Sequence, residues 1–261
     1  MTSMPAKSFI FEQPLNERIR ILLRIEAMIQ RLDYFKSLDN DTASHHAILA
    51  ILEISSLVER GDVKQEIIKE LERQHKVLTA LVSHEGVDKS RLELTLGKLK
   101  NALNTMHGMD GKLGSHLKKI DFLLTIKQRS SIPGGSCDFD LPQLRYWLNM
   151  DQAARIRDLD KWSRQYYQIN EVLKLALNII RDSGHPETTE ARQGFFQENL
   201  DPSHPNQLLR IEIPGHSACF PEISAGKHRY SVRFLHFTDG VDQIPVQYKE
   251  DVEFKLYRCS L

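Results

Sequence analysis

The chain has few cysteines, no long hydrophobic run and no excess of charge of either sign. Its three cysteines, Cys137, Cys219 and Cys259, lie far apart and suggest no disulfide framework, which is typical of a reducing compartment. No apolar stretch approaches the length that spans a bilayer, and residues 1–7 lack the apolar core of a signal peptide. We therefore expect a soluble, cytoplasmic protein that does not insert into a membrane.

The charges of the chain cancel, since 35 basic residues face 35 acidic ones in 261 residues. Zero net charge argues against bulk binding of nucleic acid, which depends on a surplus of lysine and arginine. It leaves room for a local basic patch, because the field at a surface follows the distribution of charge.

The common motifs of catalysis and cofactor binding are also missing. The 11 histidines form no His-Glu-x-x-His spacing, and the sequence has no Cys-x-x-Cys, Walker loop, dinucleotide fingerprint or Gly-x-Ser-x-Gly elbow. We expect no metal and no cofactor. One enzymatic alternative stays open, a cysteine-dependent hydrolase centred on Cys137, which follows a glycine turn and would need a base close in space.

The pattern of apolar residues changes near residue 183 and predicts an α+β protein. Before it, apolar residues recur every three to four positions, as in amphipathic helices; after it, short alternating segments are typical of strands. We predict a mainly helical domain, residues 14–183, joined to an antiparallel β-domain, residues 184–261. Residues 8–12 form a lone strand that needs a sheet, and the C-terminal strands are the only good candidates.

Polar residues mark the expected helix starts. The first helix is predicted from Pro14 and the second over residues 43–59, while Asp62, Asp88 and Asp151 are predicted to cap later helices. Asp140, with Pro142 in the first turn, is predicted to cap a short helix over residues 140–149. Residues 187–206 are polar and are predicted to be a loop-rich connection. The predicted strands that follow are residues 207–213, 218–223, 227–237, 244–248 and 252–258.

The strand over residues 227–237 carries the clearest candidate binding surface. Tyr230, Val232 and Phe234 alternate with Arg229 and Arg233, so the two arginines share the opposite face. A guanidinium binds carboxylates through paired hydrogen bonds. The alternative is an ordinary solvated sheet face. A single-stranded nucleic-acid binder that stacks bases on Tyr230 is a further alternative, although that ring is predicted to face away from the arginines.

Short segments along nearly the whole chain resemble the ZapD family, which associates with the division ring of proteobacteria. The most specific is Ser131-Ile132-Pro133-Gly134-Gly135, followed by Phe139-Asp140-Leu141-Pro142. Others are Phe11-Glu12-Gln13-Pro14-Leu15-Asn16-Glu17, Leu23-Arg24-Ile25-Glu26, Glu59-Arg60-Gly61-Asp62-Val63, Lys69-Glu70-Leu71-Glu72-Arg73-Gln74, Gly86-Val87-Asp88-Lys89-Ser90-Arg91, Gly194-Phe195-Phe196-Gln197 and Tyr230-Ser231-Val232-Arg233-Phe234.

The resemblance implies a non-catalytic homodimer that binds the C-terminal peptide of FtsZ, the tubulin-like division GTPase. Two peptide sites per dimer would cross-link and bundle filaments and so stabilise the Z ring at mid-cell. The family's pocket is basic, and the resemblance carries this role to Arg24, Arg145, Arg229, Arg233, Lys118 and Arg60. The chain differs from the family pattern at Asp121, where a basic residue is expected, and at Arg145, where histidine is expected.

Overall fold

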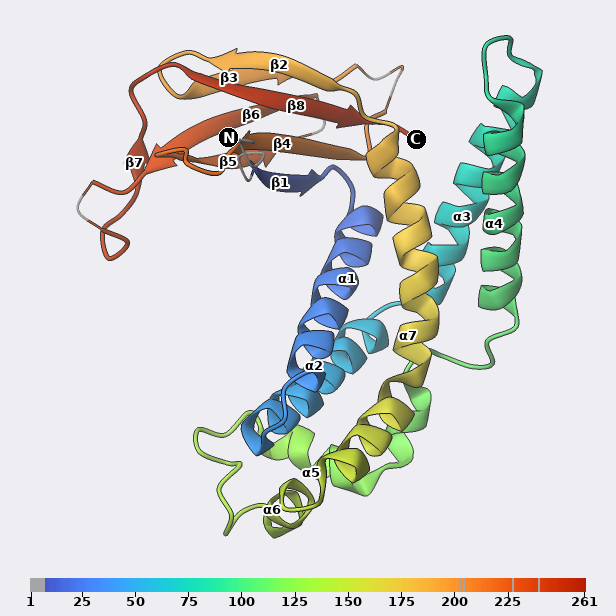
Figure 1. Cartoon of the computed structure of the whole chain (residues 1–261), viewed down its shortest axis with the longest axis vertical. Helices are drawn as coiled ribbons and strands as arrows, with labels where there is room; N and C mark the ends of the chain where they lie inside the picture. Colours follow the sequence, from blue (N-terminus) through green and yellow to red (C-terminus); the bar gives the residue numbers. More distant parts are fainter. Residues whose placement is uncertain (1–7, 202, 204, 227, 239) are drawn as a thin grey trace, which may run out of the picture. The chain divides into compact units, whose positions relative to one another are not determined.

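The computed structural model describes residues 8–201, 203, 205–226, 228–238 and 240–261 (Figure 1). The chain divides into two compact units: one holds the described residues up to Arg20 together with Leu177–Leu261, and the other is Ile21–Ala176. The predictions for residues 1–7, for Lys227 and for Asp239 lie outside the described residues. In the part of the chain that is described, no helix is long and apolar enough to cross a membrane.

The first two thirds of the chain are helical, as the sequence predicted. Two short 3₁₀ turns, Leu81–Ser83 and Ser115–Lys119, lie in the connections between helices. The helices are α1 (Glu17–Lys36), α2 (Asp41–Glu59), α3 (Val63–Ala80), α4 (Lys89–His107), α5 (Asp121–Arg129), α6 (Pro142–Leu148) and α7 (Gln152–Asp182).

Side-chain caps fix several of these helix starts. The carboxylate of Asp62 accepts the backbone N–H of Gln65, and that of Asp88 accepts the N–H of Arg91. Asp151 accepts the N–H of Ala154 at 2.8 Å. These predicted caps are confirmed, and each satisfies a backbone donor that the first helical turn leaves without a partner.

Two predicted helix starts are wrong. The predicted cap Asp140 does not cap α6: the cap position is Leu141, which gives no side-chain hydrogen bond, and Asp140 instead accepts from the Arg129 guanidinium at 3.2 Å. Similarly, α1 begins at Glu17 and not at Pro14, because Pro14 is the last residue of a strand paired with Leu208.

The helical unit is held together by apolar stripes and by a group of three aromatic rings. Phe122, Trp147 and Trp162, from α5, α6 and α7, lie with ring centroids 5.6–6.0 Å apart. Figure 1 shows α3 and α4 side by side as an antiparallel pair. The buried stripes of α1 and α7 include Leu22, Ile25, Ile29, Leu32, Leu159, Tyr166, Ile169 and Leu173.

The other unit is a two-layer β-sandwich. One sheet has the order β1-β4-β8-β2 and the other β3-β6-β5, with β7 pairing on β6. All the pairings are antiparallel. The strands are β1 (Ser8–Pro14), β2 (Pro186–Ala191), β3 (Phe195–Asn199), β4 (Leu208–Pro214), β5 (Phe220–Ala225), β6 (Arg229–His236), β7 (Val246–Gln247) and β8 (Val252–Cys259).

The predicted pairing of the N-terminal strand with the C-terminal sheet is confirmed, since β1 pairs with β4 from Ser8 opposite Pro214 to Pro14 opposite Leu208. The prediction of a loop over residues 187–206 is wrong, because β2 and β3 lie there. Alternate residues of both sheets fill one core, where the ring of Phe254 lies 5.2 Å from that of Phe234 and 5.6 Å from that of Phe196.

Candidate functional site: a basic sheet face and basic helix ends

The outward face of β6 carries the two arginines that the alternation predicted. Tyr230, Val232 and Phe234 are buried in the sandwich core, while Arg229 and Arg233 are exposed. Within the described residues, neither guanidinium has a recorded ion pair or hydrogen bond. Both side chains therefore have all their donors available to an anionic ligand.

The strands on either side of β6 define what surrounds the arginines. Arg233 lies directly opposite Phe195 on β3 and Glu222 on β5, and Arg229 lies opposite Asn199. Residues directly opposite each other in antiparallel strands share one sheet face. All three neighbours are exposed. The surface thus combines two cations with one carboxylate and an exposed aromatic ring.

In the helical unit, Lys118 lies near the Glu59 carboxylate, and Arg60 is the residue that follows Glu59. Glu59 is the last residue of α2, next to Arg60. Its carboxylate lies 3.2 Å from the Lys127 ammonium and 3.9 Å from the Lys118 ammonium. Burial alone would raise the pKa of Glu59, but hydrogen bonds from Lys127 and Ser55 and the two lysine charges outweigh it and lower the pKa. Two lysines around one ionised carboxylate leave a local positive excess.

Arg24 and Arg145 occupy two other helices of the chain. Arg24 is exposed on α1 and has no recorded partner in the described part of the chain. Arg145, on α6, lies 3.6 Å from the Asp138 carboxylate, with both side chains largely exposed. An exposed pair of this kind contributes little energy, so Arg145 exchanges partners easily. The predicted residues are therefore distributed over both units: Arg24, Arg60, Lys118 and Arg145 in the helical one, Arg229 and Arg233 in the β-sandwich.

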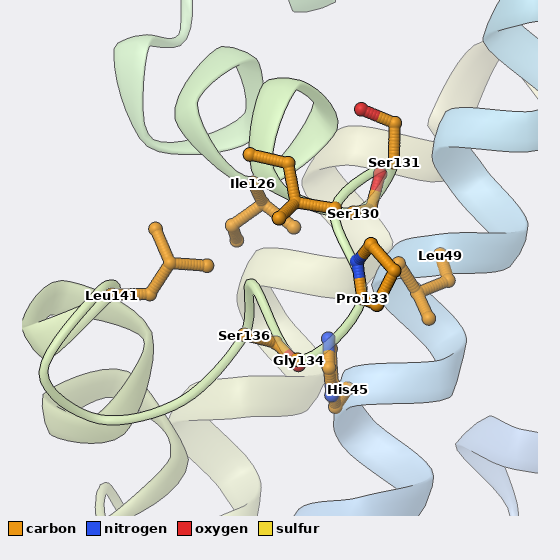
Figure 2. Close-up of a pocket in the computed structure, with 10 residues that line it drawn as sticks. His45, Leu49, Ile126, Ser130, Ser131, Pro133, Gly134, Ser136 and Leu141 are labelled. Carbon is orange, nitrogen blue, oxygen red and sulfur yellow. The ribbon is translucent and has the colours of Figure 1, made fainter.

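The glycine turn after α5 forms one wall of a pocket of about 390 Å³, shown in Figure 2. The turn is tightly built: a Cβ on Gly135 would lie 2.4 Å from the carbonyl oxygen of Arg129, so no larger residue fits. Burial lowers the pKa of His45, and the nearby His46 lowers it further, so the ring facing the pocket is neutral at pH 7. The pocket is lined by His45, Leu49, Ile126, Ser130, Ser131, Ile132, Pro133, Gly134, Ser136 and Leu141.

Cys137, the possible nucleophile, is exposed just after this turn. No side-chain hydrogen bond to its thiol is recorded among the described residues. Those same residues contain no group of three or more His, Cys, Asp or Glu side chains that could hold a metal ion.

Sequence reasoning missed two parts of this surface. It did not place Phe195 beside Arg233, because β3 was read as loop. It also missed Lys127, which shares Glu59 with Lys118. The Phe195-Phe196 pair was the available signal for the first, since neighbouring aromatic residues in a strand point to opposite faces.

Comparison with known proteins gives a consistent result. The family model "ZapD: Cell division protein" matches residues 23–233. The cell division protein ZapD of Nitrosomonas eutropha is 38% identical over 251 residues, which cover 96% of this chain and 99% of that protein. The ZapD proteins of Azoarcus sp. and Aromatoleum aromaticum are each 35% identical, the second over the full length of both chains. With a family match over most of its length and such relatives, the chain belongs to the ZapD family of cell division proteins.

Proposed function

We propose that this chain is a non-catalytic, cytoplasmic division factor that binds the C-terminal peptide of FtsZ at mid-cell. A homodimer with two such sites cross-links and bundles FtsZ filaments and so stabilises the Z ring. The observation that supports this most directly is the pair of exposed arginines on β6, which have no recorded partner among the described residues. Membership of a cell division family supports the biological setting.

The six basic residues differ in how ready they are for a ligand. Arg229 and Arg233 lie four residues apart on one strand face, about 13 Å along the strand, so an extended acidic segment can contact both. Arg24 and Arg60 are also exposed. Lys118 and Arg145 must first leave Glu59 and Asp138, at 3.9 and 3.6 Å. We therefore expect charge reversal on β6 to weaken tail binding more than changes at Lys118 or Arg145.

The cross-linking mechanism follows from weak contacts made twice. A disordered peptide loses conformational entropy when it becomes ordered, so each single contact is modest in affinity. A dimer makes the second contact intramolecular, which raises the overall avidity without any new contact. Because exposed charges are screened by salt, we expect tail binding to weaken as ionic strength rises.

Co-sedimentation with FtsZ polymers tests the proposal. The chain should pellet with full-length FtsZ polymers and stay in the supernatant with polymers that lack the C-terminal peptide. The double variant Arg229→Glu with Arg233→Glu should lose at least tenfold in co-pelleting. A control of equal charge change, Arg192→Glu with Lys249→Glu, alters exposed residues off the β6 row and should pellet normally. Equal pelleting with both FtsZ forms would contradict the proposal.

The variant Cys137→Ser separates a binding role from the hydrolase alternative. Serine keeps the size of the exposed side chain and removes the thiolate nucleophile. We expect the variant to bundle FtsZ filaments as the parent does, measured by light scattering and electron microscopy. Loss of bundling in a variant that keeps its thermal unfolding midpoint would favour chemistry at Cys137 instead.

A further inference from the structure

The outer face of the β3–β6–β5 sheet has an apolar end directly beyond its arginines. Along β6, Arg233 is followed on the same face by Leu235, which is buried, and Phe237 comes directly after the end of the strand. Phe220 lies opposite Leu235, and its ring centroid is 5.4 Å from that of Phe237. Phe195, opposite Arg233, is 40% exposed and Phe237 is 38% exposed. Aromatic rings thus lie beside and beyond Arg233 with much of their surface in water.

Exposed aromatic side chains next to arginine are typical of binding surfaces. Tyrosine, tryptophan and arginine dominate the energetics of interfaces, and large apolar side chains exposed in a group mark sites of interaction. Here Phe195 and Phe220 lie in strands and the Phe237 ring packs against that of Phe220, so a ligand would find these rings already in place. A sheet face that served only solubility would not require Phe195 and Phe237 at these positions.

The charges on this face favour an acidic ligand. Arg229 and Arg233 are opposed in register by a single acid, Glu222, which forms no recorded ion pair in the described structure. The other paired positions between the arginines are neutral: Gln197, Ser231 and Ser224. The outward-facing positions from Arg229 to Arg233, with their paired neighbours, therefore carry a net charge of one positive. The apolar side chains lie at the Arg233 end of this surface.

We propose that this face binds an extended peptide segment in which a carboxylate and a large apolar side chain lie two residues apart. Such side chains share one side of an extended chain, about 7 Å apart, which is also the step along β6 from Arg233 to Leu235. The carboxylate pairs with Arg233, and the apolar side chain packs on Phe195 and Phe237. This inference rests on the proposed function for the arginines and adds an apolar requirement to it.

Two synthetic peptides of equal composition test the spacing. One places Asp and Phe two residues apart in a neutral, disordered background, and the other places them next to each other, where they point to opposite sides. Fluorescence anisotropy with the full chain should give at least fivefold tighter binding of the first peptide. Glu222→Gln should tighten binding of both peptides, because it removes the opposing carboxylate. Equal affinity for the two peptides would overturn the proposal.

A double variant, Phe195→Ser with Phe237→Ser, tests the apolar end. It should abolish the difference between the peptides and leave the weaker affinity unchanged. The matched control Ile244→Ser replaces a side chain that is 88% exposed and should keep the difference. If the double variant instead dissociates a dimer while the parent chain does not discriminate between the peptides, the face serves self-association and the proposal fails.

The inference and the proposed function fail in different ways. If the FtsZ tail binds through the arginines but the two peptides bind equally, the apolar requirement is wrong and the proposed function stands. If the peptides are discriminated through Phe195 and Phe237 but the FtsZ tail does not bind, the surface is correctly identified and FtsZ is not its partner.

Discussion

One arginine ties the strands of both sheets together. The guanidinium of Arg258, on β8, donates to the Glu198 carboxylate at 2.7 and 3.0 Å and also reaches Glu187 on β2. The hydroxyl of Tyr230 donates to the same Glu198 carboxylate. Burial raises the pKa of Tyr230, and the hydrogen bond to Glu198 raises it further, so the phenol stays a donor. The network satisfies a carboxylate that lies on the inward side of β3.

Replacing Arg258 by Met should destabilise the fold by about 1–3 kcal/mol, because Glu198 loses a paired, charge-assisted partner while partly buried. Urea unfolding followed by circular dichroism would measure the change. Arg192→Met is the control, since Arg192 is 87% exposed in its ion pair with Glu190 and should change stability by less than about 0.5 kcal/mol. Similar losses in both variants would contradict a specific role for the network.

The neutral ring of His45 predicts a pH dependence of stability. Burial puts its folded-state pKa below the ordinary 6.5, so the unfolded chain takes up the proton first as the pH falls. The stability contributed by the neutral ring is full above pH 6.5 and is lost progressively below it. His45→Gln should therefore make the free energy of unfolding fall less steeply just below pH 6.5. An unchanged slope in denaturant titrations over that range would refute the assignment.

Strands with a clear apolar alternation were predictable, and β2 and β3 were not. On β6 the alternation predicted both the buried row and the arginine row. On β2 only Ala191 is buried, and on β3 the inward side includes Glu198. That carboxylate is acceptable only because Arg258 comes from 60 residues further along the chain, and no local pattern reveals this. The grouping of Lys118 with Lys127 was not predictable for the same reason, since it forms through Glu59.

The turn between β2 and β3 uses a backbone that favours glycine. Gln193 and Gly194 have φ angles of 50° and 71°, and a Cβ on Gly194 would lie 2.1 Å from the carbonyl oxygen of Tyr248. Gly194→Ala should therefore cost about 2–4 kcal/mol of stability. In contrast, Gly97→Ala, inside α4 with nothing within 4 Å of the new Cβ, should stabilise by about 0.5–1 kcal/mol. Thermal unfolding of both variants would show opposite shifts, and a neutral Gly194→Ala would refute the steric argument.

For the whole chain, the sequence predicted the order of helices followed by strands and the recruitment of the N-terminal strand. The domain limits, residues 14–183 and residues 8–12 with 184–261, remain a prediction. The compact units divide within α1 and within α7, and a continuous helix carries no break in apolar pattern that would mark a boundary. The dimer also remains a proposal, because the features that define a self-association surface are not encoded in a local motif.

The proposed dimer predicts a sedimenting mass of twice the 30.2 kDa of one chain. Sedimentation velocity at working concentrations would measure it. Dilution below the dimer dissociation constant should abolish filament bundling but leave binding to an isolated FtsZ tail intact, since bridging needs two sites and binding needs one. A strictly monomeric protein that still bundles filaments would contradict the cross-linking mechanism.

The position of β8 decides when its sheet can form during synthesis. β8 lies between β4 and β2 in its sheet, yet it follows both of them in the sequence and is therefore synthesised after them. β1, which precedes all the helices, pairs with β4, which follows them. The helical unit, Ile21–Ala176, is synthesised well before β8. It therefore has time to fold while the β-sandwich still lacks an interior strand. A stop codon just before Val252 would thus remove a middle strand rather than trim an edge, leaving β2 without its partner and the unfinished sheet open to aggregation.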